Sequence, residues 1–208
     1  MTISATTQGL RMGVATSSSR PAVPFDGQVI SETDTDSLKV YNGTAWVGSN
    51  GMTLLSTTTL SGSTTAITGI DQNYINLFIT VEKFYASSNA YLRLYVNGDS
   101  TAANYVSGGI RCATGLAAAV VDGQYEINGY SEKNAANNSL YTVTIPSYAN
   151  TIIKTLNCSG NQFQANSSTV ASYSHTIVYN STTAISSITF APSAGTMSAG
   201  TVRIYGVR

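Results

Sequence analysis

The chain has 208 residues, with ten basic and ten acidic side chains and a formal net charge of zero. Only 10% of the residues are charged, against roughly 25% in an ordinary globular domain, and Ser and Thr together make up roughly a quarter of the chain. Nucleic-acid recognition needs clustered positive charge, which this composition does not supply. No apolar run reaches the roughly 20 residues that cross a bilayer, so we expect neither a nucleic-acid partner nor a membrane.

Residues 1–20, "MTISATTQGLRMGVATSSSR", have no hydrophobic period and end where Arg20 meets Pro21. Small, hydroxyl-rich residues without an apolar face do not bury enough surface to fold alone. We therefore predict an extended N-terminal arm over residues 1–20 that lies against a partner.

Residues 21–52 predict a small β-hairpin docking module followed by a linker. The runs "GQVIS" and "SLKVY" are β-prone, and "ETDTD" between them supplies Asp side chains that favour a turn. "YNGTAW" adds an Asn-Gly turn before Trp46. Phe25, Tyr41 and Trp46 supply a small core, although a lone hairpin is only marginally stable in water. "GSNGM", residues 48–52, is typical of a linker.

Residues 53–208 alternate apolar and polar side chains with a period of two, which indicates β-strands. In "YINLFITVEKF", residues 74–84, alternate aliphatic side chains share one face: Ile75, Leu77, Ile79 and Val81. Further runs with the same alternation are residues 91–96, 124–130, 140–145, 151–156, 172–179, 186–191 and 201–207. The run "CATGLAAAVV", residues 112–121, fits either a short helix or a buried strand.

These runs predict an all-β protein. Clusters of Gly, Asn, Asp and Ser separate the strands, and no internal repeat indicates a propeller or solenoid. We predict an antiparallel β-sandwich of jelly-roll type over residues 53–208, preceded by the extended arm and the hairpin module.

The sequence offers little support for a cofactor or a metal. His175 is the only histidine and lies among aromatic strand residues, where a histidine usually packs or faces solvent. "ETDTD" alternates oxygen ligands as calcium loops do, but it lacks the glycine and the distal glutamate of the known loop, so turn formation explains it better. Cys112 and Cys158 do not make a disulfide framework, and we interpret them as half-buried free thiols.

Catalysis is equally unsupported, and we predict that the protein is not an enzyme. Glycoside hydrolysis uses two carboxylates that can come from distant parts of a chain. The acids of the large domain are few and scattered: Asp71, Glu82, Asp99, Asp122, Glu126 and Glu132. No nucleophile elbow, phosphate loop or dinucleotide fingerprint occurs. A surface-glycan depolymerase is therefore the weakest of the functions considered.

Thirteen tyrosines against a single tryptophan are the strongest compositional signal. Tyrosine combines an apolar ring with a polar tip, which suits protein interfaces and sugar stacking, but it is also a good strand residue. Both interpretations stay open. If the strands present a contact surface for an oligomer or a glycan, we expect it at Tyr105, Tyr173, His175 and Tyr179.

The stretch "RPAVPFDGQVISETDTDSLKVYNGTAWV", residues 20–47, resembles a segment common near the N-termini of virion proteins of tailed bacteriophages, in fibres and decoration proteins alike. The pattern is "P..G..I.ETDT..L.VY.G..W". The residues that fit it are Pro24, Gly27, Ile30, Glu32, Thr33, Asp34, Thr35, Leu38, Val40, Tyr41, Gly43 and Trp46.

Residues 53–208 resemble the C-terminal β-sandwich of minor structural proteins of such phages, those of cyanophages above all. The resemblance is carried by "LRLYVNGDSTAANY" (92–105), "IPSYANTIIKTL" (145–156) and "GTVRIYGVR" (200–208). These motifs are looser than the N-terminal one. The resemblance implies a homotrimer displayed on a capsid or tail, and it supplies no catalytic residues.

From the residues and the resemblance together we expect a capsid decoration (cement) protein of the virion, assembled in the cytoplasm of the host bacterium. Its partner is the major capsid protein, and its docking residues are Arg11, Arg20, Pro21, Pro24, Phe25, Tyr41 and Trp46. The alternative is a short tail fibre or receptor-binding protein, docked on a tail protein, whose sandwich recognises host surface glycans. Copy number per particle separates the two.

Overall fold

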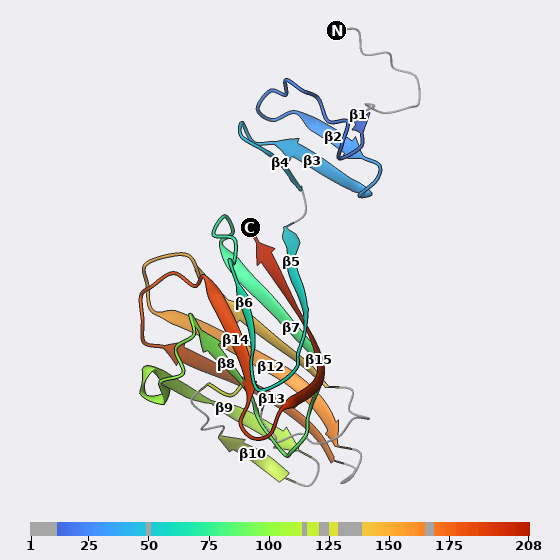
Figure 1. Cartoon of the computed structure of the whole chain (residues 1–208). Coiled ribbons are helices and arrows are strands. Elements are labelled where there is room, and N and C mark those ends of the chain that lie inside the picture. The colour runs from blue at the N-terminus through green and yellow to red at the C-terminus, as the bar shows by residue number, and fades with distance from the viewer. Residues whose placement is uncertain (1–11, 49–50, 114–115, 121–124, 129–138, 165–168) are drawn as a thin grey trace. The chain divides into compact units, whose positions relative to one another are not determined.

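The computed structural model describes residues 12–48, 51–113, 116–120, 125–128, 139–164 and 169–208. The chain divides into two compact units, Met1–Thr53 and Leu54–Arg208, which are described one at a time (Figure 1). Within the described residues, no helix has the length and apolar character needed to cross a membrane.

The first unit is a four-stranded sheet in the order β1-β2-β3-β4. Its strands are β1 (Gly13–Ala15), β2 (Val29–Glu32), β3 (Ser37–Tyr41) and β4 (Trp46–Gly48). β2 and β3 pair antiparallel, as "GQVIS" and "SLKVY" predict. β4 follows a turn in which the Oδ1 atom of Asn42 accepts hydrogen bonds from the N–H groups of Thr44 and Ala45. This side-chain turn explains the "YNGTAW" signal.

β1 places three residues of the predicted N-terminal arm, residues 1–20, in the sheet of the first unit. Gly13 lies opposite Ile30 and Ala15 opposite Glu32, so the segment joins the sheet parallel to β2. The strand has three residues and is held to the sheet by main-chain pairing, so it carries no apolar stripe that a sequence pattern would reveal. Residues 1–11 lie outside the described residues.

The second unit consists of two sheets. One has eight strands in the order β10-β9-β13-β12-β11-β7-β15-β5, and the other has three in the order β6-β14-β8. The strands are β5 (Met52–Thr59), β6 (Thr65–Thr68), β7 (Asn76–Ala86), β8 (Leu92–Val96), β9 (Tyr105–Ala113), β10 (Leu116–Val120), β11 (Leu140–Ile145), β12 (Lys154–Gln164), β13 (Thr169–Tyr179), β14 (Ser187–Pro192) and β15 (Met197–Val207). A short 3₁₀ turn, η1 (Ala102–Asn104), precedes β9.

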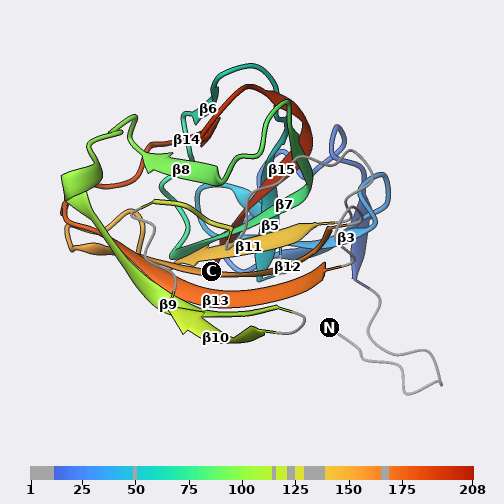
Figure 2. The ribbon, with the colours of Figure 1, turned by 90° about the horizontal axis from the view of Figure 1, so that it is seen from below.

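The two sheets face each other and enclose the core, so the second unit is a β-sandwich (Figure 2). Buried aliphatic residues of the large sheet are Leu77, Ile79 and Val81 on β7, Val143 on β11, Leu156 on β12, and Val202 and Ile204 on β15. The small sheet contributes Ile67, Leu92, Leu94, Val96, Ile188 and Phe190. Burying each such side chain stabilises the fold by roughly 1.5–3 kcal/mol before entropy is counted.

The all-β class and the antiparallel sandwich are confirmed, and the jelly-roll connection of the strands stays a prediction. Residues 124–130 differ from the predicted strand, since the described part of this run makes only an isolated bridge between Glu126 and Arg93. Ile75 differs as well, because it precedes β7 and its side chain is 59% exposed. Within 112–121, the described residues Leu116–Val120 form a strand and not a helix.

Candidate functional site

Glu32 of the "ETDT" motif is a buried carboxylate that ties three parts of the first unit together. Its Oε1 atom lies 2.5 Å from the Nε atom of Arg20, and its Oε2 atom lies 3.7 Å from the Nζ atom of Lys39. Thr35 Oγ1 also donates a hydrogen bond to Oε2 at 2.6 Å. The hydrogen bonds from Arg20 and Thr35 lower the pKa of Glu32 below its ordinary value. The motif is therefore first of all a structural one.

Asp34 acts in the same way on the segment that follows β1. Its two carboxylate oxygens accept hydrogen bonds from the N–H of Ser17 at 2.9 and 3.0 Å, and the Ser17 hydroxyl donates to Oδ2. The Ser17 hydroxyl and amide lower the pKa of Asp34. Glu32 and Asp34 thus bond to the segment before the hairpin, and the described residues contain no group of three His, Cys, Asp or Glu side chains that could hold a metal ion.

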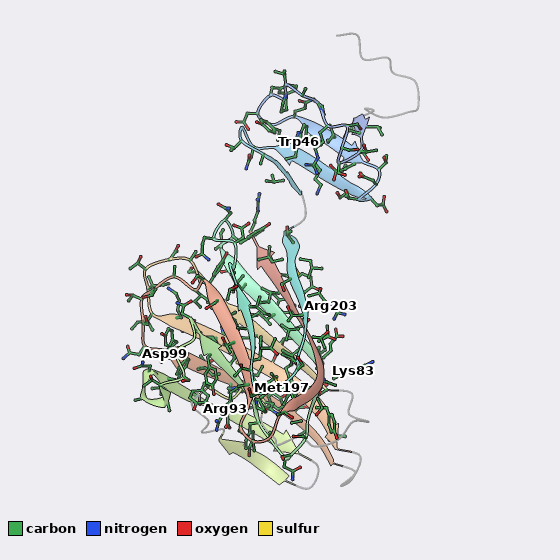
Figure 3. The ribbon with its side chains drawn as sticks, viewed as in Figure 1. Trp46, Lys83, Arg93, Asp99, Met197 and Arg203 are labelled. Atoms are coloured by element: carbon green, nitrogen blue, oxygen red, sulfur yellow. The ribbon has the colours of Figure 1, made fainter. Side chains whose placement is uncertain are left out.

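Tyr41 and Trp46 lie on the same side of the sheet as Ile30 and Glu32, which are both buried. Their ring centroids are 5.5 Å apart with an interplanar angle of 57°, and both residues are half-buried. Figure 3 labels Trp46 in the sheet of the first unit. These two predicted docking residues therefore pack within the unit and form part of its small core. We call this side of the sheet the closed face.

The opposite side of the sheet is formed by apolar side chains. Cross-strand pairing places on it Val14 of β1, Val29 and Ser31 of β2, Leu38 and Val40 of β3, and Val47 of β4. Val14 is 59% exposed, Val29 38% and Leu38 40%, while Val40 and Val47 are half-buried. Ser31 is the one polar residue among these six. We call this side the apolar face.

A proline-containing loop between β1 and β2 exposes two more apolar side chains. Val23 is 92% exposed and Phe25 is 66% exposed, whereas Pro21 and Pro24 are half-buried. Arg20, also predicted to dock, is engaged with Glu32 as described above. Arg11 lies outside the described residues.

The contact surface predicted on the sandwich is corrected by burial. The structure places all four side chains in the core, with exposed fractions of 1% for Tyr105, 4% for Tyr173 and His175, and 6% for Tyr179. Side chains alternate along a strand in the same way whether a given set faces the core or the solvent, so the sequence pattern does not show that these four side chains are buried. They are therefore not available to a glycan or a second subunit.

Tyr105 and Tyr179 instead hold the loop after β8. Their rings stack with centroids 4.8 Å apart. The Tyr105 hydroxyl donates to the carbonyl oxygen of Asp99 at 2.7 Å and accepts from the N–H of Val96 at 2.9 Å. The Tyr179 hydroxyl donates to Asp99 Oδ2 at 3.0 Å, and hydrogen bonds from Thr101 first of all lower the pKa of Asp99 to about 2.

The acids of the sandwich also have structural partners. Glu82 lies 2.7 Å from the Arg203 guanidinium, and Glu126 lies 3.5 Å from that of Arg93. Asp71 Oδ1 accepts hydrogen bonds from the amide and the side chain of Asn73. Asp122 and Glu132 lie outside the described residues. Each described acid thus contributes to the fold around it.

Sequence reasoning missed the apolar face, although a signal for it was present. Val29, Leu38, Val40 and Val47 alternate with Ile30, Tyr41 and Trp46, so the hairpin carries apolar side chains on both sides. The aromatic residues drew the docking prediction to the closed face, which the chain itself fills. The candidate site is therefore the apolar face together with the Val23–Phe25 loop.

In comparisons with known proteins, no family model, no curated protein and no solved structure matches this chain.

Proposed function

We propose that the protein is a virion structural protein of a tailed bacteriophage, a capsid decoration protein that attaches to the major capsid shell through its first unit. The observation that carries this proposal is the apolar face, with Val14, Val29 and Leu38 exposed on a sheet whose other face is closed. Exposed contiguous apolar surface on a small unit marks a protein interface. The sequence resemblance of residues 20–47 to virion proteins supports a partner on a phage particle, and we propose that this partner is the major capsid protein.

The energetics of such attachment favour a repeated shell. Burying one exposed Val or Leu side chain contributes at most roughly 1.5–3 kcal/mol, and part of that offsets the entropy lost on association. Val23 and Phe25 add apolar surface at the loop. Copies that are linked to one another gain avidity when several first units bind neighbouring shell subunits.

The sandwich is the part that we propose is displayed, and we propose that it forms a homotrimer. Support comes from the resemblance of residues 53–208 to virion proteins that form homotrimers. The free thiol of Cys158 is buried, which fits assembly in the reducing cytoplasm of a host bacterium. Light scattering on the purified protein measures the mass that this proposal requires.

Binding to particles tests the docking surface. We expect Leu38→Lys to abolish attachment to capsids that lack the protein, because the substitution places a charge in the centre of the apolar face. Thr44→Lys, at an exposed position in the turn before β4, is the matched control and should bind normally. Cosedimentation with capsids gives the bound fraction. Equal binding of the two variants, or a label found on the tail in a few copies per particle, contradicts the proposal.

A further inference from the structure

The outward side of the large sheet carries a row of side chains that crosses five neighbouring strands. Strand pairing places side by side, in this order, Tyr205 of β15, Phe78 of β7, Thr144 of β11, Asn157 of β12 and Thr176 of β13. We call these five residues the outer row. Neighbouring strands lie about 4.8 Å apart, so the row is about 19 Å long.

One end of the outer row is aromatic. The ring centroids of Phe78 and Tyr205 are 6.2 Å apart, with an interplanar angle of 42°, and both residues are half-buried. The residues on either side of them in the strands, Leu77, Ile79 and Ile204, are at most 1% exposed and fix the backbone beneath the rings. Aromatic surface held on rigid strands can stack on the apolar face of a ring-shaped ligand.

The rest of the outer row consists of hydroxyl and amide groups. The Thr176 hydroxyl donates to Asn157 Oδ1 at 3.1 Å, which leaves the Asn157 amide as a hydrogen-bond donor. A second row runs beside it, where the hydroxyls of Thr142 and Ser159 lie 2.7 Å apart. Hydroxyl groups both donate and accept, so they match the hydroxyl groups of a sugar.

Charge is missing from this part of the surface. The outward residues described on β11, β12 and β13 are Leu, Thr, Asn, Ser or Val, and none of them is charged. Arg203 of β15, labelled in Figure 3, is a cation on the same side of the sheet, and its guanidinium lies 2.7 Å from Glu82 of β7. Among the described residues, the outward side of β11, β12 and β13 therefore offers no positive charge for a sulfate, phosphate or carboxylate, and the exposed Lys83 of β7 lies five residues from Phe78.

We propose that the outer row binds a linear, uncharged oligosaccharide, with one sugar ring stacked on Phe78 and Tyr205 and the following rings hydrogen-bonded along Thr144, Asn157 and Thr176. A row of polar groups about 19 Å long fits a chain of several sugar rings better than it fits a single one. This inference concerns the sandwich alone. It goes beyond the proposed attachment and would hold for a protein on the capsid or on the tail.

Affinity electrophoresis of the full chain tests the proposal. The gels contain dextran, galactomannan or hydroxyethylcellulose as neutral probes, and polygalacturonate or dextran sulfate as acidic ones. We expect at least one neutral polysaccharide to retard the protein, and the acidic ones to have no greater effect. Tyr205→Leu keeps apolar bulk but removes the aromatic ring, and we expect it to weaken the retardation about tenfold. Asn157→Ala should weaken it too.

Thr144→Ala and Thr189→Ala form a matched pair for the position of the site. Both threonines are half-buried strand residues, but Thr189 belongs to β14 of the small sheet. Only Thr144→Ala should reduce retardation, with melting temperatures measured for every variant to establish that it is folded. Retardation by acidic polysaccharides alone, no retardation by any neutral one, or equal loss in both threonine variants overturns the proposal. So does a Tyr205→Leu variant that changes the oligomer mass and not the retardation.

Discussion

Lys154 and His175 are both buried in the sandwich, and their polar atoms are bonded to main-chain carbonyl groups. Lys154 Nζ donates to the carbonyl oxygens of Asn150 and of Ile152, the latter at 2.7 Å, so its charge is surrounded by dipoles. His175 makes one such bond, from Nε2 to the carbonyl oxygen of Glu126 at 2.9 Å, while Nδ1 is buried without a hydrogen-bond partner among the described residues. Burial lowers the pKa of both groups.

The neutral form of His175 makes the fold sensitive to acid. Because its pKa is lower in the folded protein than the ordinary 6.5, the stability is complete above pH 6.5 and falls as the pH drops below that value. We expect the melting temperature of the sandwich to decrease more steeply between pH 6.5 and pH 4.5 in the natural chain than in His175→Gln, which can still donate to the Glu126 carbonyl group. An equal decrease of the melting temperature with pH in the two proteins would show that His175 does not titrate in this range.

At the scale of the strand, β9 carries two adjacent glycines whose surroundings differ. A Cβ atom on Gly109 would lie 2.3 Å from His175 Cβ and 2.4 Å from the Ser174 carbonyl oxygen, whereas one on Gly108 would meet nothing within 4 Å. β9 therefore approaches β13 closely at Gly109, and Gly108 lies at the outward surface. Substituting each of the two glycines in turn therefore separates the effect of this close contact from the general effect of a glycine in a strand.

We expect Gly109→Ala to lower the free energy of unfolding by about 1–3 kcal/mol, because β9 or β13 must move to admit the methyl group. Gly108→Ala should leave the stability unchanged or raise it slightly, because alanine restricts the unfolded chain more than glycine does. Chemical denaturation of both variants gives the two free energies. A Gly108→Ala variant that loses as much stability as Gly109→Ala would contradict the assigned close contact.

The strands could be predicted because burial on one side of a sheet imposes a period of two, as in Leu77, Ile79 and Val81 of β7. That period does not say which side is buried when both sides carry apolar or aromatic residues. The sequence therefore placed Tyr41 and Trp46 both in the small core, where they lie, and at the docking surface, and it wrongly placed Phe25 in that core, since Phe25 is 66% exposed. β1 could not be predicted either, because three residues held by main-chain pairing leave no pattern.

For the whole molecule, the division into two units makes one further prediction. Among the described residues, the buried core cluster of the sandwich begins at Leu60, and all its members belong to the second unit. We expect residues 52–208 alone to fold with a melting temperature within a few degrees of the sandwich transition in the full chain, and to lose attachment to capsids. Calorimetry measures the first and cosedimentation the second. A truncated chain that fails to fold would show that the sandwich depends on residues before Met52.

The first unit has one closed face and one apolar face, and this asymmetry has a thermodynamic consequence. A partner that covers the apolar face binds only the folded sheet, so the partner's concentration adds to the stability of the unit by mass action. Free in solution, the unit keeps only what β1 to β4 and the bonds of Glu32 and Asp34 provide. In the attachment that we propose, by contrast, its resistance to proteolysis becomes a property of the complex, and we expect copies that have not attached to be degraded first.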